Sequence, residues 1–188
     1  MKQVRSNKIN VHVTNGMYIY FAFLLLLIPV RLLLAIVISA ALHELFHITA
    51  IRLVGKKVYS VCIAPRGTII QTQSLNDREE VICAIAGPLS GLLLMLLFRW
   101  IPLIALAGAA QSLYNMMPLY PTDGGRVLQS CVRKFFSIQR AAKIIYWTET
   151  LTLSAIMVIG VYGTFYLNLG IIPTALATLT LIKSAKLK

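Results

Sequence analysis

Charged residues are scarce in this chain of 188 residues, and acidic residues are the scarcest of them. Charged side chains make up 13% of the sequence, 58% of it is apolar, and its mean hydropathy is +0.78. A water-soluble domain carries about 25% charged residues, so a soluble globular fold is excluded. Because each membrane-spanning helix uses about 20 residues, a large domain outside the membrane is excluded as well.

Cysteine is also rare, and its spacing excludes two further classes of protein. The three cysteines are Cys62, Cys83 and Cys131, an odd number with no CxxC pair. A disulfide framework and a zinc site built from cysteine are therefore not expected, and we predict three reduced thiols. No small-residue cleavage site follows the first apolar run, so we expect no cleavable signal peptide.

Basic residues dominate the few charges that exist. The chain holds 18 Lys and Arg against 6 Asp and Glu, a formal net charge of +12. In a soluble protein this excess would indicate nucleic-acid binding. Here the basic residues lie between apolar runs, as they do in the cytoplasmic segments of membrane proteins, and we expect no nucleic-acid partner.

The apolar runs predict an all-α polytopic membrane protein with about six transmembrane helices. Pro29 and Arg31 divide the first long run, which as one helix would be about 57 Å long, far beyond a hydrocarbon core of about 30 Å. Residues 58–64 and 68–73 flank a Pro-Arg-Gly turn and predict a short β-hairpin between the second and third helices. The predicted helices are 14–30, 32–54, 81–98, 101–117, 143–162 and 164–182.

The distribution of basic residues predicts the orientation of these helices. With the N-terminus inside, 16 basic residues lie in inner segments and 2 in outer segments, so both termini are expected in the cytoplasm. Residues 124–142 combine basic and apolar side chains. They suit either a helix on the inner membrane surface or an ordinary basic loop.

The second predicted helix contains His43-Glu44-Leu45-Phe46-His47, an HExxH motif. Residues four apart share one face of a helix, so both imidazoles can reach one cation, and Glu44 lies beside them. This pattern is typical of a zinc hydrolase core. Three ionisable residues within five positions of a membrane helix are costly to bury, which favours a functional role. The alternative is two histidines that hydrogen-bond to neighbouring helices.

A catalytic zinc site usually takes three protein ligands, and the third must come from elsewhere in the chain. Asp123 is the best candidate, because Pro118, Pro121 and a Gly pair interrupt the helix just before it and after it. Glu149, in the fifth predicted helix, is a minor candidate. The acidic residues at 77–80 are better explained as a solvated cluster.

The HELFH sequence in one helix and NMMPLYPTDGG at the end of a later one resemble the site-2 protease family of intramembrane zinc metalloproteases. The resemblance covers about residues 9–130 and is greatest to the sporulation factor IV FB branch. It implies one zinc ion per chain and a Glu44 general base. The implied zinc ligands are His43, His47 and Asp123.

The resemblance also implies contacts with a substrate. Asn115 would contact the substrate backbone or the developing oxyanion, although it also fits a polar cap of a broken helix. The other residues expected to contact the substrate are Pro118, Pro121 and Gly124. Gly87 and Gly91, which the family pattern also contains, are more simply explained as small residues that allow close helix packing.

These observations predict one intramembrane metalloprotease domain over residues 1–188, with additional helices at about 143–182 and no PDZ or CBS domain. The expected location is a bacterial cell membrane, with the active site toward the cytoplasm. Its partners would be the lipid bilayer, a membrane-tethered protein substrate, such as a pro-transcription factor in sporulation, and inhibitory membrane proteins. The alternatives are a non-proteolytic zinc-binding scaffold and a transporter-like protein.

Overall fold

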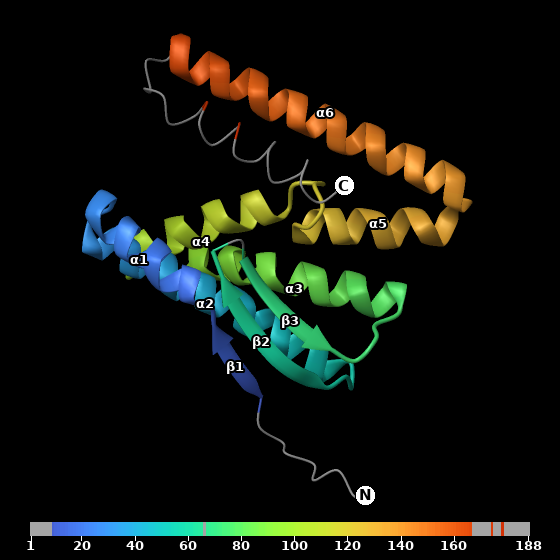
Figure 1. Cartoon of the computed structure of the whole chain (residues 1–188), viewed down its shortest axis with the longest axis horizontal. Coiled ribbons are helices and arrows are strands. Elements are labelled where there is room, and N and C mark those ends of the chain that lie inside the picture. The colour runs from blue at the N-terminus through green and yellow to red at the C-terminus, as the bar shows by residue number, and fades with distance from the viewer. Residues whose placement is uncertain (1–8, 66, 167–173, 175–177, 179–188) are drawn as a thin grey trace, which may run out of the picture. The chain divides into compact units, whose positions relative to one another are not determined.

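A computed structural model describes residues 9–65 and 67–166, together with Thr174 and Thr178. The chain divides into two compact units, Met1–Ser112 and Leu113–Lys188. Most of the predicted helix at 164–182 lies outside the described residues. In chain order the elements are β1 (Asn10–Val13), α1 (Asn15–Leu27), α2 (Val30–Leu53), β2 (Val58–Ala64), β3 (Gly67–Thr72), α3 (Asp77–Leu96), α4 (Pro102–Asn115), α5 (Asp123–Phe135) and α6 (Ile138–Phe165) (Figure 1).

The mostly helical fold with a small sheet confirms the predicted fold class. Three of the described helices, α2, α3 and α6, are long and apolar enough to cross a membrane. Helices α1 and α4, with 13 and 14 residues, are shorter than the runs that predicted them. Pro29 directly precedes α2 and separates it from α1. This break was predicted, because proline has no amide hydrogen to donate within a continuous helix.

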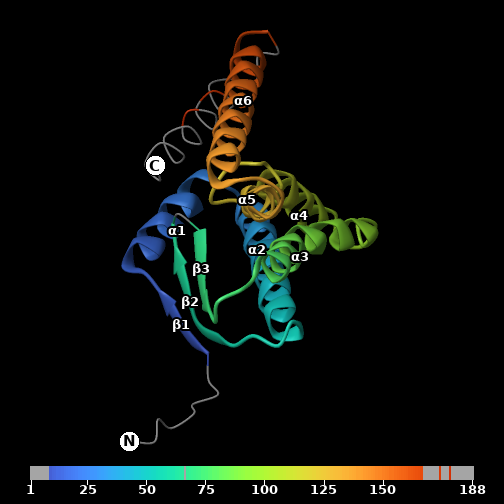
Figure 2. The same ribbon diagram turned by 90° about the vertical axis from the view of Figure 1, so that its right-hand side faces the viewer.

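The predicted hairpin is part of a sheet with three strands in the order β1-β2-β3. Strands β2 and β3 are antiparallel, and the turn between them ends at Gly67, whose φ of 126° disfavours any residue with a side chain. Strand β1, which was not predicted, lies parallel to β2. Parallel strands need a long crossover connection, and α1 and α2 supply it (Figure 2).

Helices α2 and α3 pack against each other in the first unit, and many of their large apolar side chains are exposed. The buried residues of α2 include Ser39, His43 and His47 as well as Leu33 and Ile51, while most of its other leucines and isoleucines are exposed. Gly91 of α3 lies so close to α4 that a Cβ atom would be 2.2 Å from the Gly108 carbonyl oxygen. Small residues and polar side chains inside and apolar ones outside are typical of helices packed within a bilayer.

In the second unit, the basic stretch at 124–142 forms a helix rather than a loop. Helix α5 covers most of it and packs against α6. Phe136 and Ser137 separate the two helices, and Ser137 is the N-cap residue of α6. Helix α6 therefore begins at Ile138, five residues before the predicted start at 143. Whether α5 lies on the membrane surface stays a prediction.

Candidate metal centre

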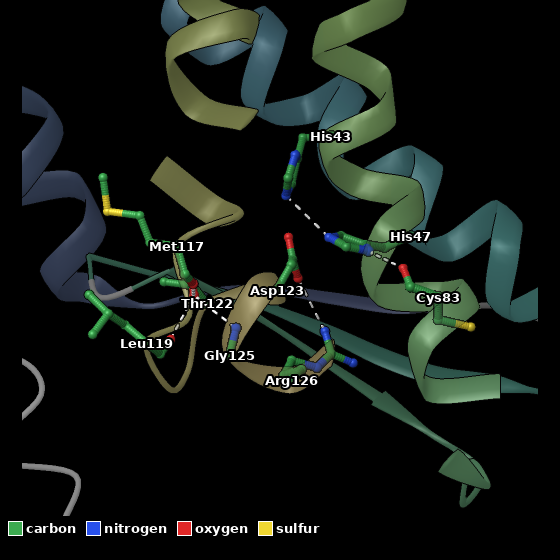
Figure 3. A network of polar contacts seen from close by, with 9 residues as sticks. All are labelled: His43, His47, Cys83, Met117, Leu119, Thr122, Asp123, Gly125 and Arg126. Carbon is green, nitrogen blue, oxygen red and sulfur yellow. Dashed lines mark hydrogen bonds and ion pairs between the residues drawn. The ribbon is translucent and has the colours of Figure 1, made fainter. Parts of the chain in front are cut away.

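The two histidines of the HExxH motif lie one turn apart on α2, and both are buried, with exposed fractions of 3% and 5%. Their Nε2 atoms are 3.1 Å apart, and their rings meet edge to face (Figure 3). Two imidazole nitrogens on one tetrahedral zinc, each about 2.0–2.1 Å from the metal, are about 3.3 Å apart. The spacing of the pair therefore fits one zinc ion.

A backbone contact fixes the tautomer of His47. Its Nδ1 atom lies 2.7 Å from the carbonyl oxygen of Cys83 on α3. A carbonyl can only accept a hydrogen bond, so Nδ1 must carry the proton and donate it. The lone pair then lies on Nε2, the atom that faces His43, and is available for a metal. Such a support is usual behind metal-bound histidines, where it sets the ring orientation.

Gly87 of α3 faces the two imidazole rings directly. A Cβ atom at this position would lie 2.2 Å from Nε2 of His47 and 2.8 Å from Cε1 of His43. The interpretation of this glycine as a plain helix-packing residue is therefore incomplete, because the missing side chain also makes room for the candidate ligands. For Gly91, which faces α4, the interpretation as a helix-packing residue holds.

Asp123 begins α5 in the second unit and has an exposed fraction of 6%. The preceding residue, Thr122, is the N-cap, and its hydroxyl oxygen accepts a hydrogen bond from the Gly125 amide. The same hydroxyl lies 2.6 Å from the carbonyl oxygens of Met117 and Leu119, and it is the only donor in these contacts. The Thr122 side chain therefore links the non-helical segment 116–121 to the first turn of α5.

The Asp123 carboxylate also has a basic neighbour on its own helix. The Arg126 guanidinium lies 3.4 Å from its Oδ1 atom. Asp123 also lies in the first turn of α5, where the helix dipole favours negative charge. The ion pair and the helix N-terminus thus both place positive charge beside this carboxylate.

The two glycines after Asp123 let the first turn of α5 lie against the loop before it. A Cβ atom at Gly124 would be 2.2 Å from the Met116 carbonyl oxygen, and one at Gly125 would be 2.5 Å from the Leu119 carbonyl carbon. This packing explains Gly124 without a substrate. Pro118 is half-buried and Pro121 is exposed. Substrate contacts of these three residues stay a prediction.

Among the described residues, three buried side chains are the candidate ligands for a metal ion: His43 and His47 in the first unit and Asp123 in the second. The other acidic residues are placed differently. Glu149 accepts a hydrogen bond from the Tyr120 amide, while Glu79 caps α3 and pairs with Lys56 at 3.0 Å.

The remaining predicted catalytic residues are Glu44 and Asn115. Glu44 follows His43 on α2 and is half-buried. Asn115 is the last residue of α4 and is also half-buried. Their chemical roles stay predictions.

A known protein and a solved structure, both from one organism, are similar to this chain. No family model matches the chain. A zinc metalloprotease, MJ0392, from Methanocaldococcus jannaschii is 24% identical over 127 residues, which cover 60% of this chain and only 38% of that protein. The solved structure of a site-2 protease from the same organism matches the fold with a TM-score of 0.66 at 19% identity, over 99% of this chain and 93% of that one.

Proposed function

We propose that the chain is a member of the site-2 protease family and a zinc metalloprotease that cleaves a peptide bond in or beside the membrane-spanning segment of its substrate, as its similarity to the zinc metalloprotease and to the site-2 protease fold supports. The observation that carries this proposal is the pair of buried imidazoles, whose Nε2 atoms are 3.1 Å apart. The fixed tautomer of His47 supports it further, since it leaves a lone pair for the metal.

One zinc ion would be held by His43, His47 and Asp123, which are all buried and offer the nitrogen and oxygen ligands that zinc takes. When bound, zinc supplies Lewis acidity, which polarises the scissile carbonyl and lowers the pKa of a water molecule. Glu44 takes a proton from the attacking water and delivers it to the leaving amine. The Asn115 amide donates a hydrogen bond to the oxygen that gains negative charge.

The depth of the histidines on α2 supports a substrate that is itself in the membrane. His43 and His47 precede Leu53, the last residue of the helix, by ten and six positions. At about 1.5 Å per residue they lie about 15 Å and 9 Å inside the end of the helix. We propose a single-pass, membrane-tethered protein as the substrate, and a pro-transcription factor released during sporulation is one example.

The basic residues support a multi-pass orientation with the active site toward the cytoplasm, because 16 of 18 then lie in inner segments. Labelling of single cysteines with an impermeant thiol reagent in intact cells tests this orientation. A cysteine placed at position 2 should react only after the membrane is opened. Reaction in intact cells would contradict the proposed orientation.

The function is tested by zinc analysis of the purified protein and cleavage of a reconstituted single-pass substrate by wild type and Glu44→Gln. We expect the variant to retain zinc and to lose at least about 100-fold in cleavage rate, because it lacks the general base. Glu80→Gln, the same change at the start of α3, is the matched control and should cleave normally.

Equal cleavage by wild type and Glu44→Gln would contradict the role of Glu44. Bound zinc without cleavage by the wild type would favour a zinc-binding scaffold. A folded protein that neither binds zinc nor cleaves the substrate would favour the transporter-like alternative.

A further inference from the structure

A carboxylate is buried in α6, the helix that follows the candidate metal centre in the chain. Glu149 has an exposed fraction of 6%, although α6 is a candidate membrane span with most of its surface exposed. An ionisable side chain within a membrane span is costly and is a functional candidate by default. The proposed reaction makes no use of it, so its role needs a separate explanation.

The contact of Glu149 leads to the broken segment before Asp123. Its Oε1 atom accepts a hydrogen bond from the backbone amide of Tyr120, at 3.2 Å. The neighbouring threonines behave differently, since Thr148 and Thr150 donate to the carbonyl oxygens of Ile144 and Tyr146 on their own helix. Glu149 thus connects α6 to the loop, whereas these hydroxyls stabilise α6 alone.

The Tyr120 amide belongs to the same peptide unit as the Leu119 carbonyl, and that carbonyl is also held. It accepts hydrogen bonds from the Thr122 hydroxyl at 2.6 Å and from the Thr122 amide at 2.7 Å. A peptide unit is planar, so contacts at both of its ends fix the orientation of the whole plane. Gly125 packs on the same unit, where a Cβ atom would lie 2.7 Å from the Tyr120 nitrogen.

We propose that Glu149 is a positioning residue that fixes the peptide unit between Leu119 and Tyr120, and through Thr122 orients the Asp123 carboxylate. This gives α6 a role, which is to supply the acceptor for the N–H end of that unit. The inference rests on the proposed function, because it requires Asp123 to be a zinc ligand. Thr122, the N-cap of α5, connects this peptide unit to Asp123, since its hydroxyl binds the Leu119 carbonyl and it immediately precedes Asp123.

The test uses the full-length protein in detergent with three variants. Glu149→Met removes the acceptor at similar size, and Glu149→Gln keeps an oxygen acceptor without the charge. Thr150→Val, on the next residue of α6, is the matched control. Two quantities are measured: hydrogen exchange of the Tyr120 amide in zinc-free protein labelled with ¹⁵N-tyrosine, and zinc affinity by competition with a chelator.

In the wild type and Thr150→Val, the Tyr120 amide should be protected from exchange. Glu149→Met should lose this protection and bind zinc about 10-fold more weakly, at the lower end of the effect of removing supports behind metal ligands. Glu149→Gln should restore zinc affinity to within about 3-fold of wild type, because an amide oxygen still accepts the hydrogen bond. If Glu149 were itself a zinc ligand, Gln would weaken binding as much as Met.

Several outcomes would overturn the inference. A Tyr120 amide that exchanges freely in the wild type shows that the contact is absent, and this measurement needs no variant. Unchanged zinc affinity in Glu149→Met, or in Glu149→Ala should Met prevent folding, excludes the positioning role. In that case, wild-type zinc binding and cleavage leave the proposed function intact. A wild-type protein that binds no zinc overturns both this inference and the proposed function, whatever the exchange data show.

Discussion

The two regions that carry candidate zinc ligands are supported in opposite ways. Around the histidines of α2, the supports are the Cys83 carbonyl and the absence of a side chain at Gly87. Around Asp123, the supports are side chains: the Thr122 hydroxyl, the Arg126 guanidinium and, through the Tyr120 amide, the Glu149 carboxylate. The first region depends on backbone and space, and the second depends on polar side chains.

The difference follows from the local structure. A regular helix spaces His43 and His47 by itself, so the neighbouring helix needs only to approach closely and offer a carbonyl. The segment before Asp123 leaves helical geometry, and its backbone groups must find partners outside a regular ladder. We therefore expect the histidine region to be damaged by added atoms and the Asp123 region by removed hydrogen-bonding groups.

The largest expected effect is that of Gly87→Ala. The added methyl group would overlap the His47 ring, which can turn away without unfolding the protein but cannot then share a metal with His43. We expect zinc affinity to fall by about 100-fold, the upper end for changes around metal ligands. The free energy of unfolding should change little. The displaced His47 ring destabilises the fold, and the higher helix propensity of alanine, about 0.5–1 kcal/mol over glycine, acts in the opposite direction.

Zinc content per folded chain, together with thermal unfolding of the zinc-free protein, measures the effect of Gly87→Ala. Ile85→Ala, at an exposed position of the same helix, is the control and should bind zinc normally. Full zinc affinity in Gly87→Ala would show that the imidazoles are not held in the observed place.

A smaller effect is expected from Thr122→Val, which keeps the shape of the side chain but removes its hydroxyl. Loss of the N-cap should destabilise the fold by about 1 kcal/mol. Zinc affinity should fall by about 10-fold, because the Met117 and Leu119 carbonyls lose their shared donor. Thr122→Ser retains the hydroxyl and should resemble wild type in a chelator competition. A Val variant equal to the Ser variant would refute side-chain support of Asp123.

The smallest effect is expected from Cys83→Ala, although Cys83 lies directly behind His47. The contact uses the backbone carbonyl, which alanine also has, so zinc affinity should stay within about 2-fold of wild type. The same chelator competition measures it. Loss of zinc in Cys83→Ala would indicate that the thiol is a ligand, and the contrast between the two regions would fail.

Much of the fold was predictable because it depends on local patterns. The HExxH helix, the hairpin at 58–73 and the end of α4 before the prolines follow from periodicity and turn residues. Strand β1 was missed because four residues carry too little pattern, and its pairing with β2 joins residues far apart in the chain. The N-cap at Thr122 could have been found, since Thr directly before an acidic residue is a typical helix start.

The sequence by itself determined that His43 and His47 lie on one face of a helix, because an i, i+4 pair needs no other part of the chain to share a face. It also indicated that Asp123 ends an interrupted segment. Only the tertiary structure decided which nitrogen of His47 carries the proton, why position 87 is glycine, and that Glu149 binds the Tyr120 amide. These properties depend on contacts between helices distant in sequence, and no local pattern encodes such contacts.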